Sequence, residues 1–153
     1  SVVCSGLSMP HSPRIHGGRL YVLNSGTGDL GWIDTDAPPE EAFKPIKFLP
    51  GFARGLSFYG NSAIVGLSKP RYERFEGLNL DDRLKSADSE AWCGVQVIDL
   101  TSGKVEHWFR IDGKVTELYD TAIVKGHSCS MALGFSSSEI LNLITHGTEA
   151  ATT

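Results

Sequence analysis

"IHGGRLYVL" at residues 15–23 and "FYGNSAIVG" at residues 58–66 are two versions of one pattern. Their offset of 43 residues places Gly17 on Gly60 and Val22 on Val65. In each copy a glycine-containing turn leads into a short apolar run, which is typical of a β-hairpin because glycine adopts the positive φ of tight turns. The pattern therefore predicts a fold built from similar β-hairpins.

Short runs rich in Val, Ile, Tyr and Trp, bounded by turn residues, predict further strands. "WIDT" at 32–35 matches "VIDL" at 97–100 at the larger offset of 65 residues. The extra 22 residues correspond to the segment 70–92, which we interpret as an insertion. We expect Asn79 to cap a short helix there, with Leu80, Leu84 and Ala87 roughly on one face. The predicted strands are residues 19–25, 30–35, 43–49, 62–68, 94–100, 105–111 and 120–126.

A period of about 43 residues with four short strands is typical of β-propeller blades. We therefore predict an all-β, β-propeller-like fold of about two and a half four-stranded blades, with one inserted loop or short helix. An irregular β-sandwich with a similar number of strands is the alternative. We expect a partial propeller over 1–146 and a flexible tail at 147–153. Within the propeller, blade one is at 10–49, blade two at 53–111 including the insertion 70–92, and a partial blade three at 117–145. Residues 1–6 are expected to form a strand of a preceding blade.

Charge and composition exclude several classes of function. A net charge of -4 argues against a nucleic-acid partner, because phosphate binding needs a concentrated basic surface. The basic cluster within 69–74 is interleaved with glutamates and is interpreted as a solvated loop. No run of 18 apolar residues is present, so no membrane span is expected. Three dispersed cysteines and histidines without ligand spacing predict neither a metal site nor a cofactor, and they fit a reducing cytoplasm.

Three polar residues occupy equivalent places in the pattern. The offset of 43 residues places His11 on Arg54, and an offset of 66 places Arg54 on Asp120. Each lies six residues before a turn glycine, namely Gly17, Gly60 and Gly126. In a propeller such positions lie at one end of the channel, so we expect these side chains to converge. Polar groups at one level of an apolar channel are typical of a ligand pocket, although an Arg–Asp pair can also close a channel structurally.

Four further residues extend this candidate site. Glu117 and Tyr119 lie beside Asp120, Arg14 follows His11 by three positions, and Asn24 ends a predicted strand. For Asn24 the alternative is a purely structural turn with the glycines that follow it. The predicted ligand-binding set is His11, Arg14, Asn24, Arg54, Glu117, Tyr119 and Asp120.

Three stretches carry a resemblance to a known family: "GLSMPHSPR" at 6–14, "LNSGTG" at 23–28 and "IDLTSGKVEHWFR" at 98–110. They resemble uncharacterised bacterial proteins grouped under the label DUF4915, and the likeness extends over about residues 6–144. The resemblance implies that this chain corresponds to the C-terminal half of such a protein. Relatives are sometimes joined to tetratricopeptide repeats, which implies an interaction role. Likeness to six-bladed propellers of the gluconolactonase type is at the level of fold and assigns no activity.

Three functions remain open, and with them whether the protein is an enzyme. The first is a binding module that takes a small polar or anionic ligand, or a peptide, with Arg54 as a clamp. The second is a metal-dependent hydrolase of the gluconolactonase type that uses Asn24, Glu117 and Asp120, ranked lower because Arg54 repels a cation. The third is a pure protein-interaction scaffold. Open sheet edges predict a homo-oligomer, a dimer that completes a ring, unless the chain is a piece of a longer protein.

Overall fold

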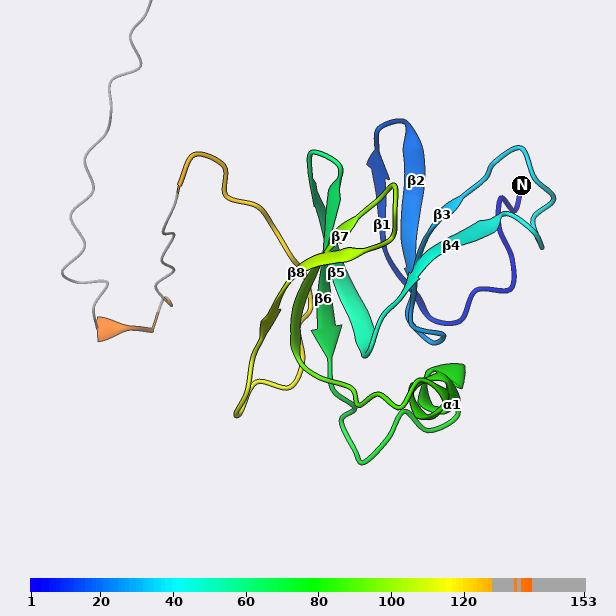
Figure 1. Cartoon of the computed structure of the whole chain (residues 1–153). Helices are drawn as coiled ribbons and strands as arrows, with labels where there is room; N and C mark the ends of the chain where they lie inside the picture. The colour runs from blue at the N-terminus through cyan, green and yellow to red at the C-terminus, as the bar shows by residue number, and fades with distance from the viewer. Residues whose placement is uncertain (128–133, 135, 139–153) are drawn as a thin grey trace, which may run out of the picture. The chain divides into compact units, whose positions relative to one another are not determined.

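The computed structural model describes residues 1–127, 134 and 136–138. Within these residues the chain forms two four-stranded antiparallel sheets and one short helix (Figure 1), which confirms the all-β prediction. Contacts group Ser1–Ile123 into one compact unit and Val124–Thr153 into a second. The strands of the first sheet, in spatial order, are β1 (Pro10–His16), β2 (Arg19–Asn24), β3 (Asp29–Ile33) and β4 (Phe43–Phe48). Those of the second are β5 (Phe52–Tyr59), β6 (Ser62–Ser68), β7 (Gly94–Asp99) and β8 (Val105–Arg110).

The first two strands of each sheet pair in a corresponding register. His11 lies opposite Leu23 in the first sheet, and Arg54 lies opposite Gly66 in the second. In both sheets the register shifts directly after this pair, as at a β-bulge. His11 and Arg54 therefore occupy comparable places, at the start of an irregularity in their strands.

Strand β1 forms even though it contains two prolines. Pro10 begins the strand, and Pro13 falls in the register shift, where the missing N–H removes no regular bond of the β1–β2 ladder. Ser12 has a positive φ of 51°, and its hydroxyl accepts a hydrogen bond of 3.0 Å from the Gly55 N–H. The irregular part of β1 is thereby tied to the irregular part of β5.

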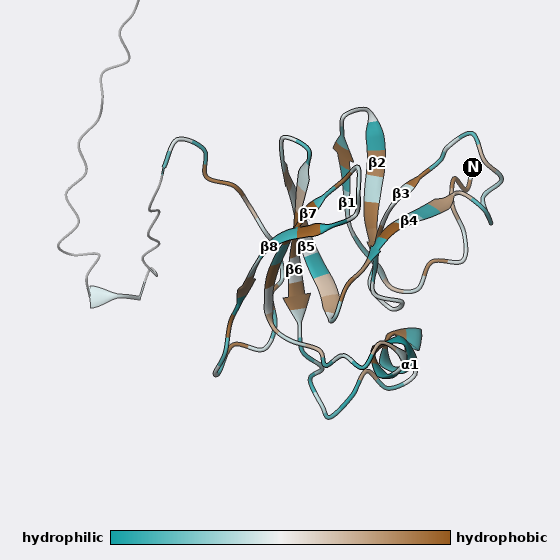
Figure 2. Ribbon diagram, in the orientation of Figure 1, coloured by the Kyte–Doolittle hydropathy of each residue, from teal (hydrophilic) through white to brown (hydrophobic). Residues whose placement is uncertain are grey.

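The two sheets pack against each other through a shared hydrophobic core, with β1 beside β5. Alternate residues of β6, among them Val65 and Leu67, are fully buried, as the period-2 alternation of a strand requires. They meet Leu23 and Leu30 of the first sheet and Ile98 of β7. Hydrophobic residues are accordingly concentrated in the strands (Figure 2). Each buried Leu, Ile or Val contributes roughly 1.5–3 kcal/mol, so this core is the main source of stability.

The insertion contains helix α1 (Asn79–Ser86), which lies at the end of the sheets where β2 turns into β3 (Figure 1). Leu80 and Leu84 are buried on one face, as the spacing predicted, whereas Ala87 follows the last helical residue and is exposed. The predicted Asn79 cap is wrong, because the residue before the helix is Leu78 and makes no side-chain cap bond. The N–H of Leu80 donates instead to the carbonyl of Gly26, at 3.0 Å, so the β2–β3 turn satisfies the helix terminus.

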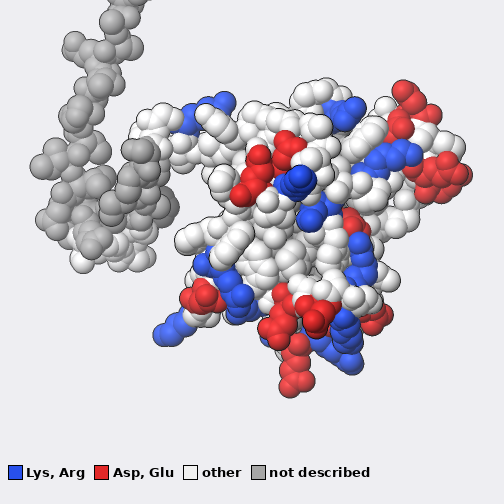
Figure 3. Space-filling view, viewed as in Figure 1, with Lys and Arg blue, Asp and Glu red and all other residues white. Residues whose placement is uncertain are grey.

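Arg83 attaches α1 to the first sheet. It forms an ion pair with Asp29 and donates to the carbonyl of Thr27 at 2.7 Å, and its guanidinium lies 4.5 Å from the centre of the Phe48 ring. On the helix itself Lys85 pairs with Asp81 at 2.8 Å, and acidic and basic side chains lie side by side at this end of the molecule (Figure 3). The insertion is thus held at its helix by both apolar and ionic contacts.

Two predicted strands do not form. Residues 120–126 contain no strand, although the segment 116–121 lies along β5 and β6 through bonds from Leu118 N–H to Ser68 Oγ (2.9 Å) and from Thr121 Oγ1 to the Ile64 carbonyl (3.1 Å). These bonds involve hydroxyl side chains, whereas a strand needs a backbone ladder. Residues 1–6 also form no strand. Outside the described residues lie the remaining parts of the expected blade three, at 128–133, 135 and 139–145, and the expected tail at 147–153. The blade boundaries therefore stay predictions.

Candidate functional site

A cleft of about 390 Å³ opens where β5 begins and where the insertion leaves β6. We call it the Arg54 cleft. Its volume lies within the usual range of small-molecule sites. Its walls are apolar, from Met9, Phe52, Phe75 and Leu78, and its charged lining consists of Arg54, Lys69, Arg71, Arg74, Glu76 and Glu117.

Arg54 enters this cleft from β5 between two aromatic rings. Its guanidinium carbon lies 5.3 Å from the centre of the Tyr119 ring and 5.7 Å from that of Phe52. Its Nε is buried and has no hydrogen-bond partner, and no residue of the described chain forms an ion pair with it. A buried donor without an acceptor costs about 1–3 kcal/mol, so this guanidinium is suited to receive an acceptor from outside.

Glu117 is clamped beside Arg54 by Arg71. The two bonds, from Nε to Oε1 at 2.8 Å and from Nη2 to Oε2 at 3.1 Å, give the bidentate geometry of a strong carboxylate–guanidinium pair. The hydrogen bond from Arg71 holds the pKa of Glu117 below its ordinary value, and the charge of Arg54 acts in the same direction. Glu117 in turn raises the pKa of Arg71. Arg71 is therefore already neutralised by a carboxylate, whereas Arg54 is not.

His11, on β1, does not line the Arg54 cleft but lies against Phe52, which does. Its Nδ1 lies 2.8 Å from the Met9 carbonyl and donates to it, because a carbonyl oxygen only accepts. The ring stands edge-on to Phe52, with 5.3 Å between the ring centres. His11 and Arg54 thus both contact Phe52, one from each sheet.

Asp120 pairs with Arg14 rather than with Arg54. The closest distance is 3.4 Å, and the two side chains are 63% and 43% exposed. An exposed pair of this kind contributes about 0–1 kcal/mol. The segment 116–121 therefore brings Glu117 and Tyr119 to Arg54, but it directs the second acidic candidate, Asp120, to Arg14 of β1.

Asn24 has a role inside the first sheet. It is 5% exposed, and its Oδ1 accepts a hydrogen bond of 2.7 Å from the Ser8 N–H. Its carbonyl accepts bonds from the N–H groups of Thr27 and Gly28. These contacts favour the structural turn for Asn24.

Arg71 and the aromatic wall of the cleft were not predicted from the sequence. The cluster Lys69, Arg71, Arg74 was a visible signal, but the interleaved glutamates favoured a solvated loop. The partner of Arg71 is Glu117, 46 positions further along the chain, and no local pattern relates the two.

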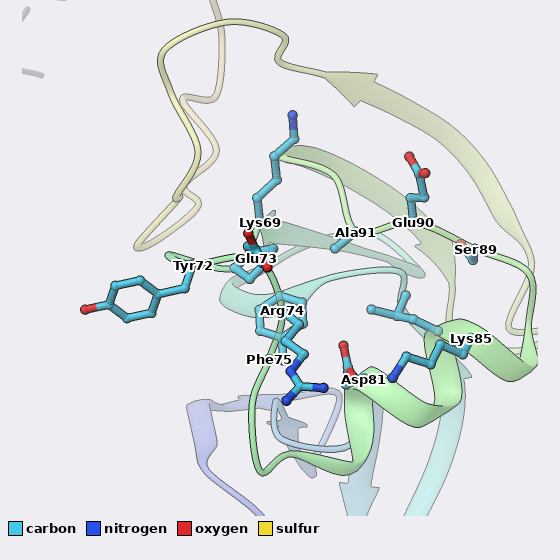
Figure 4. A pocket seen from close by; sticks show the side chains of 12 residues that line it. Lys69, Tyr72, Glu73, Arg74, Phe75, Asp81, Lys85, Ser89, Glu90 and Ala91 are labelled. Atoms are coloured by element: carbon cyan, nitrogen blue, oxygen red, sulfur yellow. Dashed lines mark hydrogen bonds and ion pairs between the residues drawn. The ribbon is translucent and has the colours of Figure 1, made fainter.

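A second cleft of about 450 Å³ lies within the insertion (Figure 4). Three of its charged side chains are in ion pairs, with Lys85 2.8 Å from Asp81 and Arg74 2.9 Å from Glu76. Tyr72 points away from it, with 87% of the residue exposed (Figure 4). It therefore lacks the buried, unpaired donor that distinguishes the Arg54 cleft.

The three oxygen donors predicted for a metal have separate partners: Glu117 with Arg71, Asp120 with Arg14, and Asn24 with Ser8. Across residues 1–127, 134 and 136–138, no three His, Cys, Asp or Glu side chains gather as a metal site would require. In that same part of the chain, no helix has the length and apolar character needed to cross a membrane.

Comparison with known proteins gives one match. A family model described as "Domain of unknown function (DUF4915)" matches residues 1–133. No match was found among curated proteins or among solved structures. The matched range includes both sheets, α1 and every residue of the Arg54 cleft. The chain therefore belongs to the DUF4915 family.

Proposed function

We propose that this chain is a binding module that takes a small anionic ligand in the Arg54 cleft. The observation that carries the proposal is the buried Arg54 Nε, which has no acceptor among the described residues. The cleft has four cationic and two anionic side chains, although the chain as a whole has a net charge of -4. This local excess of positive charge favours an anion.

We also propose that the two sheets are consecutive blades of a propeller-like arrangement. The corresponding registers of β1–β2 and β5–β6, and the contact between β1 and β5, support it. In such an arrangement the starts of β1 and β5 lie at one end of the channel. The Arg54 cleft contains residues from the start of β5 and Met9, which directly precedes β1.

The metal-dependent hydrolase is a weaker proposal, because Arg14 and Arg71 neutralise the acidic candidates and Arg54 adds a further cation. Calorimetry with calcium tests it: binding that is lost in Asp120→Asn would support the hydrolase over the anion-binding module. A pure interaction scaffold predicts that substitution of Arg54 leaves anion binding unchanged. We also propose that the protein is located in the cytoplasm.

The decisive experiment compares Arg54→Ala with Arg19→Ala in an NMR titration with inorganic phosphate and with acetate. Arg19 is a matched control, because its guanidinium also lies over an aromatic ring, 4.6 Å from the centre of Trp32, but outside the cleft. We expect Arg54→Ala to weaken anion binding about tenfold or more, equivalent to at least about 1.4 kcal/mol, and Arg19→Ala to leave it unchanged. Equal affinities for wild type and Arg54→Ala would refute the proposal.

A further inference from the structure

We infer that the ligand of the Arg54 cleft is a carboxylate joined to a flat apolar body, such as a small aromatic acid. The inference rests on the proposed anion-binding function and specifies the class of ligand. Three features of the cleft carry it: the state of its charges, its apolar walls and its size.

The geometry of Arg54 suits a carboxylate. The N–H groups of a guanidinium lie in its plane and form a fork that matches the two oxygens of a carboxylate. The rings of Phe52 and Tyr119 lie near this group, with their centres 5.7 Å and 5.3 Å from the guanidinium carbon. A planar carboxylate that approaches this fork would bring an acceptor to Arg54, for whose Nε the described chain supplies none.

The charge balance favours an anionic ligand over a neutral one. Of the four cations, Arg71 is paired with Glu117 and Arg74 with Glu76, so Arg54 and Lys69 remain. No carboxylate of the described chain forms an ion pair with these two cations, so their positive charge attracts an anionic group of the ligand.

The remainder of the cleft is built for an apolar group. The rings of Phe52 and Phe75 lie nearly parallel, with 6.1 Å between their centres. Met9 and Leu78 add aliphatic surface, and Met9 is 49% exposed although it is hydrophobic. Methionine adapts its shape and contacts aromatic rings favourably, so this side chain can close over a flat ligand.

The size of the cleft separates a small molecule from a peptide. A volume of about 390 Å³ lies in the lower part of the range for ligand sites. It accommodates one ring with a short acidic chain, whereas a peptide segment would extend beyond it.

The test is an NMR titration with three probes: 3-phenylpropionate, acetate and inorganic phosphate. We expect 3-phenylpropionate to bind at least tenfold more tightly than either of the others. Met9→Ala should weaken 3-phenylpropionate severalfold and leave acetate unchanged. Arg54→Gln should weaken both carboxylates, whereas Arg19→Ala should weaken neither. Circular dichroism establishes that each variant is folded, and Arg54→Lys, which retains the charge, should keep part of the affinity if Arg54→Gln unfolds.

The outcomes separate this inference from the proposed function. If acetate and 3-phenylpropionate bind equally and both depend on Arg54, the anion site stands and the apolar-body inference is overturned. If phosphate binds more tightly than 3-phenylpropionate, the ligand is of the phosphate class and the inference is again overturned. If no probe depends on Arg54, the proposed function itself fails.

Discussion

Arg54 differs from the other arginines of the described chain in how its guanidinium is satisfied. Five of them form ion pairs with a carboxylate: Arg14, Arg71, Arg74, Arg83 and Arg110. Arg19 forms none, but it is exposed to water, which supplies acceptors. Arg54 alone among these combines a buried Nε with the absence of an acceptor from the described residues. Since desolvation of an unpaired donor is costly, Arg54 lowers the stability of the fold at this position.

The carboxylate of Glu117 lies beside Arg54, and its pKa depends on Arg71. Substitution of Arg71 by Gln should raise the pKa of Glu117 toward its ordinary 4.5, because the hydrogen bond from Arg71 is the largest cause of its lowering. NMR titration of the Glu117 carboxyl group measures this. Asp99 is the control, because its lowered pKa results from hydrogen bonds with Ser102 and should stay unchanged.

The ion pair between Arg71 and Glu117 makes the free energy of unfolding depend on pH. Because the pKa of Glu117 is lower in the folded chain than its ordinary 4.5, the ion pair stabilises the fold above that value. This contribution is lost as the pH falls below 4.5 and through the lowered pKa of the folded state. The difference in stability between wild type and Arg71→Gln should therefore shrink on acidification, and a difference that is constant over this window would contradict the assignment.

At the scale of elements, the segment 116–121 reaches the cleft because β5 lets another backbone approach it closely. Gly55 has a φ of +79°, and a Cβ at this position would come within 2.5 Å of the backbone of Asp120 and Thr121. The side chains of Ser57 and Thr121 add a bond of 3.2 Å. The absence of one side chain on β5 therefore decides whether Glu117 and Tyr119 can lie next to Arg54.

Gly55→Ala should therefore destabilise the chain more than Gly60→Ala does. Gly60 also has a positive φ, +57°, but a Cβ there would meet nothing within 4 Å. Backbone strain is similar in the two variants, so their difference isolates the close approach of the segment 116–121. We expect an extra loss of about 1–3 kcal/mol in urea unfolding, together with weaker anion binding. Equal losses would mean that the segment is not held against β5 as described.

At the scale of the whole molecule, β4 and β8 are the outer strands of the two sheets, and their free edges differ in composition. β4 contains Pro45 flanked by Lys44 and Lys47, which are common means of preventing pairing with another chain. β8 contains no proline, and its Trp108 and Phe109 are 68% and 66% exposed. The edge of β8 is therefore the better candidate for contact with a second copy, and the dimer that completes a ring stays a prediction.

Light scattering tests this self-association. We expect the wild-type chain to exceed its monomer mass of 16.6 kDa, and the double variant Trp108→Ser with Phe109→Ser to return to it. Ile15→Ser is the control, because Ile15 is 79% exposed on β1 and lies away from this edge. A monodisperse wild-type monomer would defeat the predicted dimer.

The sequence by itself determined the class of fold and the positions of most strands. Alternating apolar residues and glycine turns report on neighbours one or two positions away, which is the range over which a strand or hairpin is specified. The predicted strand at 62–68 has the bounds of β6, and the predicted strands at 19–25 and 94–100 each exceed β2 and β7 by one residue. The buried face of the insertion helix, with Leu80 and Leu84, was predictable for the same reason.

Only the tertiary structure decided which distant residues meet. Arg71 finds Glu117 because the insertion begins at the end of β6 and the segment 116–121 returns along β5 and β6. The carbonyl of Asn24 accepts hydrogen bonds within its own turn, and the carbonyl of Gly26 accepts one from the N-terminus of α1. These contacts depend on the direction in which a long connection folds back. That direction is set by packing of the whole core and by close backbone approach, which a local pattern of residue types does not encode.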